Sequence, residues 1–236
     1  MGVVKARIAG TPDNPVIVDA QRYVINDGEL GSNYFFTIYA ENEANLLFGN
    51  KGYGVFRYNE TTNGLEPVST HKYENMTLNN ILAISKDSSN NYLFGTSYGL
   101  IKYTSETSYQ LFNAKNGFLN NTIHAILRNS SDNFWLSTNL GLINFDTKRN
   151  VFRSYGFGDG LKVVEFSDGA GFRDSRTGTL FFGGINGVVA IRADGRPEQL
   201  YMPPVYFDKL SIFGEQYNLG LSLIHISEPT RHAQIS

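Results

Sequence analysis

The nine residues FWLSTNLGL, at positions 134–142, decide the fold of this protein. Apolar and β-forming residues lead into a short polar turn, and a glycine then opens a second apolar run that ends at Phe145. This pattern predicts two short antiparallel strands joined by a tight hairpin. It occurs four times, as NLLFGNKGYGVFRY (45–58), NYLFGTSYGLIKY (91–103), NFWLSTNLGLINF (133–145) and TLFFGGINGVVAI (179–191).

The four copies recur at similar distances. The glycines that end the four hairpin turns are Gly54, Gly99, Gly141 and Gly187, so successive copies are 45, 42 and 46 residues apart. A looser stretch closes each unit, as at Tyr109–Phe112 and Val151–Tyr155. Another apolar stretch opens each unit, at Phe35–Tyr39, Ile81–Ile84, Ile123–Leu127 and Gly169–Phe172.

Four short strands in a period of about 40–50 residues are typical of a β-propeller blade. The 3.6-residue periodicity of helical repeats is absent. A blade buries its faces only by stacking on its neighbours, so the large residues at one position of each copy are expected in the core: Leu47, Leu93, Trp135 and Phe181. The sequence therefore predicts an all-β protein, a partial β-propeller of about four four-stranded blades.

The composition excludes several classes of protein. The 236 residues carry a net charge of −2, which gives no electrostatic footprint for nucleic acid. The chain has no cysteine, so disulfides and thiolate metal sites are excluded. No apolar run approaches the roughly 18–20 residues of a membrane helix, and no secretory signal is visible in residues 2–20.

The last sixteen residues, LSLIHISEPTRHAQIS (221–236), differ in composition from the rest of the chain. They resemble one reading frame of a translated sequencing adapter, with a real amphipathic segment as the alternative. We treat them as a non-native tail and exclude them from the fold. The native reading frame is accordingly expected to continue beyond Gly220.

Residues 134–142, and next Tyr92–Leu100, resemble the two-component-regulator propeller repeat. The linker Asn116–Ile126 (NGFLNNTIHAI) is similar to the family linker G-L-x-x-N-x-I-x-x-I, and the resemblance covers about residues 20–195. Met202–Leu210 resembles the entry strand of the β-sandwich that follows such propellers. Some copies depart from the family repeat. The family tryptophan is replaced by Leu47, Leu93 and Phe181, and the family threonine by Asn50 and Gly184.

The resemblance implies a domain organisation. Residues 1–30 are expected to be the end of a preceding blade and a linker, and residues 31–200 four blades. Residues 201–220 are expected to begin a three-Tyr-type β-sandwich, with its first strand, before the tail at 221–236. Four blades of a larger ring predict an open arc with two uncovered faces.

The resemblance also implies a function. Such propellers form the periplasmic sensor region of hybrid two-component histidine kinases in Bacteroidetes, which respond to glycan-derived oligosaccharides and regulate transcription. The implied partners are an oligosaccharide or other small ligand, the remaining propeller and sandwich of the same chain, and a second copy in a homodimer. The fragment itself is expected to contact no nucleic acid and to use no cofactor.

One end of the propeller is expected to carry the binding residues. In antiparallel blades the second-to-third-strand hairpins and the blade-to-blade linkers share one rim. Tyrosine rings stack on sugar C–H surfaces, and asparagine amides bond sugar hydroxyls. The alternative is that these residues only satisfy turn geometry. The candidate ligand-binding residues are Tyr53, Tyr98, Asn139, Asn186 and Asn121.

The sequence predicts no catalytic residue and no metal ligand. The carboxylates Asp159, Glu165 and Asp168 are spread over a linker and are interpreted as turn residues. His71 and His124 lack metal-ligand spacing, and His124 is interpreted as a satisfied core or channel-lining histidine. The fragment is therefore predicted not to be an enzyme. A propeller-type polysaccharide lyase or hydrolase, and a secreted interaction propeller, are the alternative functions.

Overall fold

The computed structural model describes residues 2–24, 33–42, 44–68, 80–105 and 107–192, and the backbone of 210–212 and 215–217. The chain divides into two units, Met1–Gly195 and Arg196–Ser236. Described residues of the second unit form two short antiparallel strands, β18 (Leu210–Ile212) and β19 (Glu215–Tyr217). Of the predicted sandwich strand, residues 202–209 lie outside the described residues, as does the predicted tail at 221–236.

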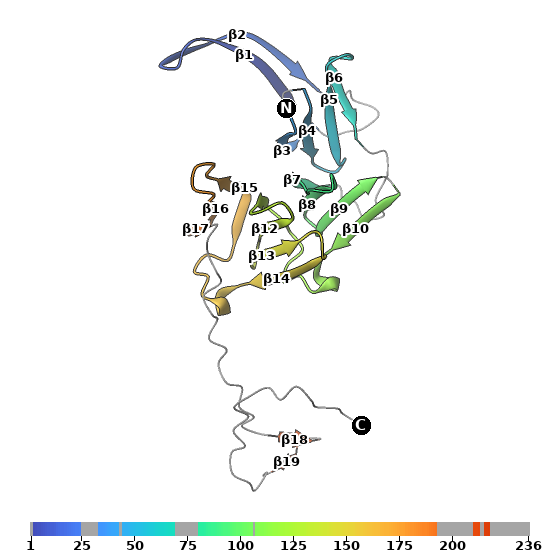
Figure 1. Ribbon diagram of the computed structural model, residues 1–236, viewed down its shortest axis with the longest axis vertical. Helices are drawn as coiled ribbons and strands as arrows, with labels where there is room; N and C mark the ends of the chain where they lie inside the picture. The colour runs from blue at the N-terminus through green and yellow to red at the C-terminus, as the bar shows by residue number, and fades with distance from the viewer. Residues whose placement is uncertain are drawn as a thin grey trace. The chain divides into compact units, whose positions relative to one another are not determined.

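The first unit is built from successive antiparallel sheets (Figure 1). Three of these sheets have four strands in sequence order, the last has three described strands, and a two-stranded hairpin precedes them. The predicted four-blade partial propeller is therefore confirmed. The blades are β3 (Phe35–Ala40), β4 (Leu46–Asn50), β5 (Val55–Asn59) and β6 (Gly64–Pro67); β7 (Ile81–Lys86), β8 (Tyr92–Thr96), β9 (Leu100–Ser105) and β10 (Ser108–Phe112); β11 (Ala125–Arg128), β12 (Asn133–Thr138), β13 (Gly141–Asp146) and β14 (Val151–Tyr155); and β15 (Phe166–Arg173), β16 (Leu180–Gly184) and β17 (Gly187–Ile191).

The central hairpins of the second and third blades have the same side-chain hydrogen-bond pattern. The hydroxyl of Thr138 donates to the carbonyl of Gly141 at 2.9 Å and accepts from the amide of Leu140 at 3.0 Å. Thr96 bonds Gly99 and Tyr98 in the same way. A threonine at the end of the second strand thus satisfies turn groups that water would otherwise reach.

The core lies between neighbouring blades. Strands β3, β7, β11 and β15 are the innermost strands and contact one another in succession. Leu47 and Leu93 are fully buried, as predicted. Trp135 and Phe181 are only partly buried, which corrects the expectation for these two positions. The Trp135 ring lies 5.1 Å from that of Tyr155 in the outer strand, and Phe181 belongs to the last blade, which has no described neighbour on its far side.

The two ends of the series expose apolar side chains. Ile38 in the first blade is 65% exposed and Val188 in the fourth is 66% exposed. By contrast, residues Ile81 to Ser85 of β7, which lies between two blades, are all buried. The exposed ends confirm the predicted open arc.

A long hairpin precedes the first blade. Strands β1 (Val3–Thr11) and β2 (Asn14–Tyr23) pair along their whole length and are exposed except at the base. At the base, Tyr23 is buried against Phe48 and Phe56, and its hydroxyl donates to Asn63 Oδ1 at 2.8 Å. An antiparallel pair is what the outer half of a blade contains, and the assignment of residues 1–30 to a preceding blade remains a prediction.

Candidate functional site

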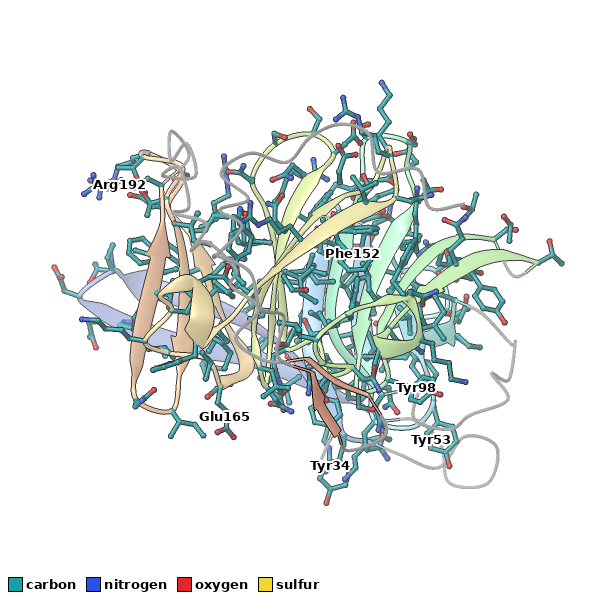
Figure 2. All side chains as sticks on the ribbon, turned by 90° about the horizontal axis from the view of Figure 1, so that it is seen from below. Tyr34, Tyr53, Tyr98, Phe152, Glu165 and Arg192 are labelled. Carbon is teal, nitrogen blue, oxygen red and sulfur yellow. The ribbon has the colours of Figure 1, made fainter. Side chains whose placement is uncertain are left out.

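The predicted binding residues lie at one end of the propeller, which we call the hairpin rim. It consists of the β4–β5, β8–β9, β12–β13 and β16–β17 hairpins together with the linkers that enter β11 and β15. Figure 2 shows Tyr34, Tyr53, Tyr98 and Glu165 on this side of the molecule and Arg192 on the opposite side. Whether these residues bind a ligand remains a prediction.

Three polar side chains from two blades meet at this rim. His124 Nδ1 lies 2.5 Å from Asp168 Oδ1, and His124 Nε2 lies 2.6 Å from Asn139 Oδ1. His124 is 8% exposed, whereas the side chain of Asp168 is 52% exposed. Because an asparagine amide offers both an acceptor and a donor, it can satisfy the ring nitrogen that faces it. His124 is thus the satisfied histidine that the sequence predicted.

An irregularity in β15 brings Asp168 to this position. Phe166 pairs with Gly184, but the next paired residue is Gly171, which pairs with Phe182. The residues between them form a bulge, with Gly169 at φ 67° and its amide donating to the carbonyl of His124 at 3.3 Å. Bulges redirect side chains out of the sheet. The sequence predicted this strand to begin only at Gly169, so the bulge was missed.

The linkers before β11 and β15 share one design. Each contains a single 3₁₀ turn, η2 (Ala114–Asn116) or η3 (Phe157–Asp159), and each turn ends at a glycine with positive φ. Asn121 Oδ1 accepts from the amide of Ala114 at 2.8 Å, so this predicted binding residue also stabilises the first turn. Asp159 Oδ2 accepts from the amide of Gly156 at 2.9 Å, as expected of a turn residue.

The aromatic candidates differ in burial. Tyr53 is 36% exposed in the β4–β5 turn, and Asn186 is exposed in the β16–β17 turn. Tyr98 is partly buried against the core of the first two blades, so less of its ring is available to a ligand. The sequence did not single out Tyr34, which is 51% exposed and has the Lys51 ammonium 5.5 Å from its ring centre. Its position directly before the inner strand β3 could have identified Tyr34 as a rim residue from the sequence.

The rim offers hydrogen-bonding chemistry. A half-exposed carboxylate oriented by a buried histidine accepts from hydroxyl groups, and exposed tyrosine rings provide stacking surfaces. Both nitrogens of His124 already have partners, so the ring has no unoccupied nitrogen for proton abstraction. Within the described part of the chain, no three His, Cys, Asp or Glu side chains form a group that could hold a metal ion.

The fold is a partial β-propeller whose hairpin rim carries polar and aromatic side chains. The solved extracellular domain of the hybrid two component system BT3049 from B. thetaiotaomicron has a similar structure, with a TM-score of 0.60 and 27% sequence identity over 75% of this chain and 24% of that one. The extracellular domain of the hybrid two component system BT4673 from the same organism matches with a TM-score of 0.51 and 18% identity, over 86% of this chain and 25% of that one. No protein-family model and no curated protein matches the chain.

The likeness to the BT3049 domain confirms the resemblance to two-component propellers that the repeats predicted, and the BT4673 domain shares the fold. The chain spans about a quarter of the length of each of these extracellular domains. Among the described residues, no helix has the length and apolar character needed to cross a membrane.

Proposed function

We propose that this chain is part of the ligand-sensing periplasmic region of a hybrid two-component sensor histidine kinase, in which glycan-derived oligosaccharides regulate transcription. The observation that carries the proposal is the likeness to an extracellular domain of such a system, at 27% identity over three quarters of this chain. The intact protein then contains the rest of the propeller, the β-sandwich and the kinase, and functions as a homodimer.

The chemistry of the hairpin rim supports a saccharide as the ligand. A sugar presents hydroxyl groups, which need both donors and acceptors, and flat C–H surfaces, which stack on aromatic rings. Asp168 and Asn139 provide an oriented carboxylate and amide, and Tyr34 and Tyr53 expose aromatic rings on the same rim. Asn186 and Tyr98 are the other proposed ligand-binding residues. Asn121, also proposed, accepts a hydrogen bond from the amide of Ala114 within the linker before β11.

The arrangement favours a sensor over a propeller-type lyase or hydrolase. Glycoside hydrolysis needs two carboxyl groups that flank one bond. Of the three acidic residues, Asp159 accepts a backbone hydrogen bond within its own turn and Asp168 contacts His124. A secreted interaction propeller would use the same rim for a protein partner.

The experiment uses the full-length gene that encodes this chain, with a transcriptional reporter in the native host. Oligosaccharides released from complex glycans are tested singly for induction. We expect Asp168→Asn and Tyr53→Ala to raise the inducing concentration about tenfold or more, and Glu60→Gln, in a turn outside the rim, to leave it unchanged. Induction unaffected by either rim variant would contradict the rim assignment. Cleavage of the glycan by the purified extracellular region would contradict the sensor proposal.

A further inference from the structure

A polar cavity of about 240 Å³ lies along the outer strands of the second blade, where one turn of the third blade approaches them. Its lining comes from β9, β10 and two turns, β7–β8 and β13–β14, and Figure 1 shows these elements side by side. Both turns are at the end of the blades opposite the hairpin rim, so this cavity is separate from the site described above. The residues that matter here are Asn91, Lys102, Thr104, Tyr109, Gln110 and Asn150.

Lys102 brings a positive charge into this cavity without an acidic partner. Its Nζ donates to the backbone carbonyl of Thr147 at 2.6 Å and to Asn150 Oδ1 at 3.1 Å, and both acceptors are neutral. The ion pairs between described residues do not include Lys102. Because an ammonium group has three N–H donors, one donor remains for a ligand.

The neighbouring polar groups are held in place. Asn150 Nδ2 donates to Gln110 Oε1 at 3.2 Å, which joins the third blade to the outer strand of the second. The hydroxyl of Thr104 donates to Asn91 Oδ1 at 2.7 Å, and Asn91 Nδ2 donates to the buried carboxylate of Asp87 at 2.8 Å. Amide and hydroxyl groups fixed in this way lose little conformational entropy on binding a ligand.

An aromatic side chain lines the same cavity. Tyr109 lies on the edge strand β10 and is 41% exposed. An exposed tyrosine ring provides a stacking surface for a sugar ring. The cavity thus combines a stacking surface, several neutral hydrogen-bonding groups and a single positive charge.

We propose that this cavity is a second saccharide site, and that it is selective for an acidic saccharide whose carboxylate or sulfate group binds Lys102. A neutral sugar would leave the third donor of Lys102 without a charged acceptor, whereas an anionic group forms the stronger charge-assisted hydrogen bond. None of the described residues that line the cavity carries a carboxylate. The proposal does not depend on the hairpin rim or on signalling.

The test is isothermal titration of the 236-residue chain with three probes: a glucuronic acid disaccharide, the matched neutral glucose disaccharide and glucose 6-sulfate. We expect at least one acidic probe to bind about tenfold or more tightly than the neutral disaccharide, and the better probe identifies carboxylate or sulfate as the preferred group. Equal affinity for acidic and neutral probes, or no binding of either acidic probe, overturns the proposal.

Matched variants locate the binding. Lys102→Gln should weaken the acidic probe about tenfold or more, while Lys115→Gln, the same charge change at an exposed residue of the η2 turn, should not. Tyr109→Ala, on the exposed edge strand, should weaken binding severalfold and keeps the test valid if Lys102→Gln unfolds. Equal affinities for the Lys102 and Lys115 variants would refute the assignment.

Discussion

His124, which directly precedes the inner strand of the third blade, contacts Asp168 in the bulged inner strand of the fourth, with 2.5 Å between Nδ1 and Oδ1. The amide of Gly169 in the same bulge donates to the backbone carbonyl of His124. A side-chain pair and a backbone bond therefore join two blades at the point where the hairpin rim approaches the inner strands. The pair both joins the two blades and fixes the half-exposed carboxylate of Asp168.

This contact is expected to contribute measurably to stability. His124→Ala should lower the free energy of unfolding by about 1–3 kcal/mol, because it removes a buried ring and both of its side-chain hydrogen bonds. Asp168→Asn should cost less, about 1 kcal/mol, since the carboxylate is half exposed and its charge is screened by solvent. Urea denaturation of both single variants and the double variant provides the test, and strictly additive effects would show that the pair does not interact.

Gly95 is required by the close approach of two blades. A Cβ atom there would lie 2.9 Å from Ile123 Cγ2 and 3.0 Å from the carbonyl oxygen of Ile123, which is fully buried. We expect Gly95→Ala to destabilise the protein by about 1–3 kcal/mol, as overpacking in cores does. Gly158→Ala is the matched control, since no atom lies within 4 Å of its added Cβ. Equal melting temperatures for the two variants would contradict this steric explanation.

The hydroxyl of Thr138 supports its hairpin through two hydrogen bonds. Thr138→Ala should destabilise the protein by about 1–2 kcal/mol, because the residue is 1% exposed and both hydrogen bonds of its hydroxyl are lost. Thr138→Ser retains the hydroxyl and should recover most of this loss. The measurement is thermal unfolding of the three proteins side by side. A serine variant as unstable as the alanine variant would assign the effect to the methyl group instead.

Glu41 should make stability depend on pH in the acidic range. Burial raises the pKa of its carboxyl, but hydrogen bonds from Lys86 at 2.7 Å and Tyr92 at 2.9 Å outweigh burial and hold the pKa below the ordinary value of 4.5. A lowered folded-state pKa gives stability that is complete above the unfolded-state value and is lost as the pH falls through the folded-state value.

Glu41→Gln should therefore be about 1 kcal/mol less stable than the native chain at pH 7, and the gap should close as the pH falls below about 4.5. Urea denaturation at a series of pH values measures the gap, with the exposed Glu60→Gln as a control. A gap that stays constant from neutral to acidic pH would exclude the Lys86–Glu41 contact as its source.

The repeat itself was predictable from the chain. Each glycine hairpin is a local device, and its spacing fixes the number of blades, so residues 134–142 and their three counterparts predicted the strands that the structure contains. The burial of Leu47 and Leu93 also followed from the pattern, because each side chain packs against the next blade in the series. Trp135 and Phe181 departed from the pattern because burial at one sequence position depends on which residues cover that part of the blade.

The candidate site was only partly predictable. Asn139 was expected on the rim, and its place in the β12–β13 hairpin follows from local turn geometry. Its contact with His124, and the contact of His124 with Asp168, join positions that are far apart in sequence. The cavity beside Lys102 likewise depends on a contact between residues far apart in sequence, since Lys102 and Asn150 lie in different blades.

Local physical chemistry in the sequence determined the strands, the hairpins and the blade repeat, because alternating apolar residues, turn residues and glycines act over a few neighbouring positions. Tertiary structure alone decided which polar groups meet between blades, because the packing of one sheet on the next sets those distances. The bulge at Phe166–Gly171 illustrates the difference, since it redirects Asp168 toward a histidine 44 residues earlier in the chain.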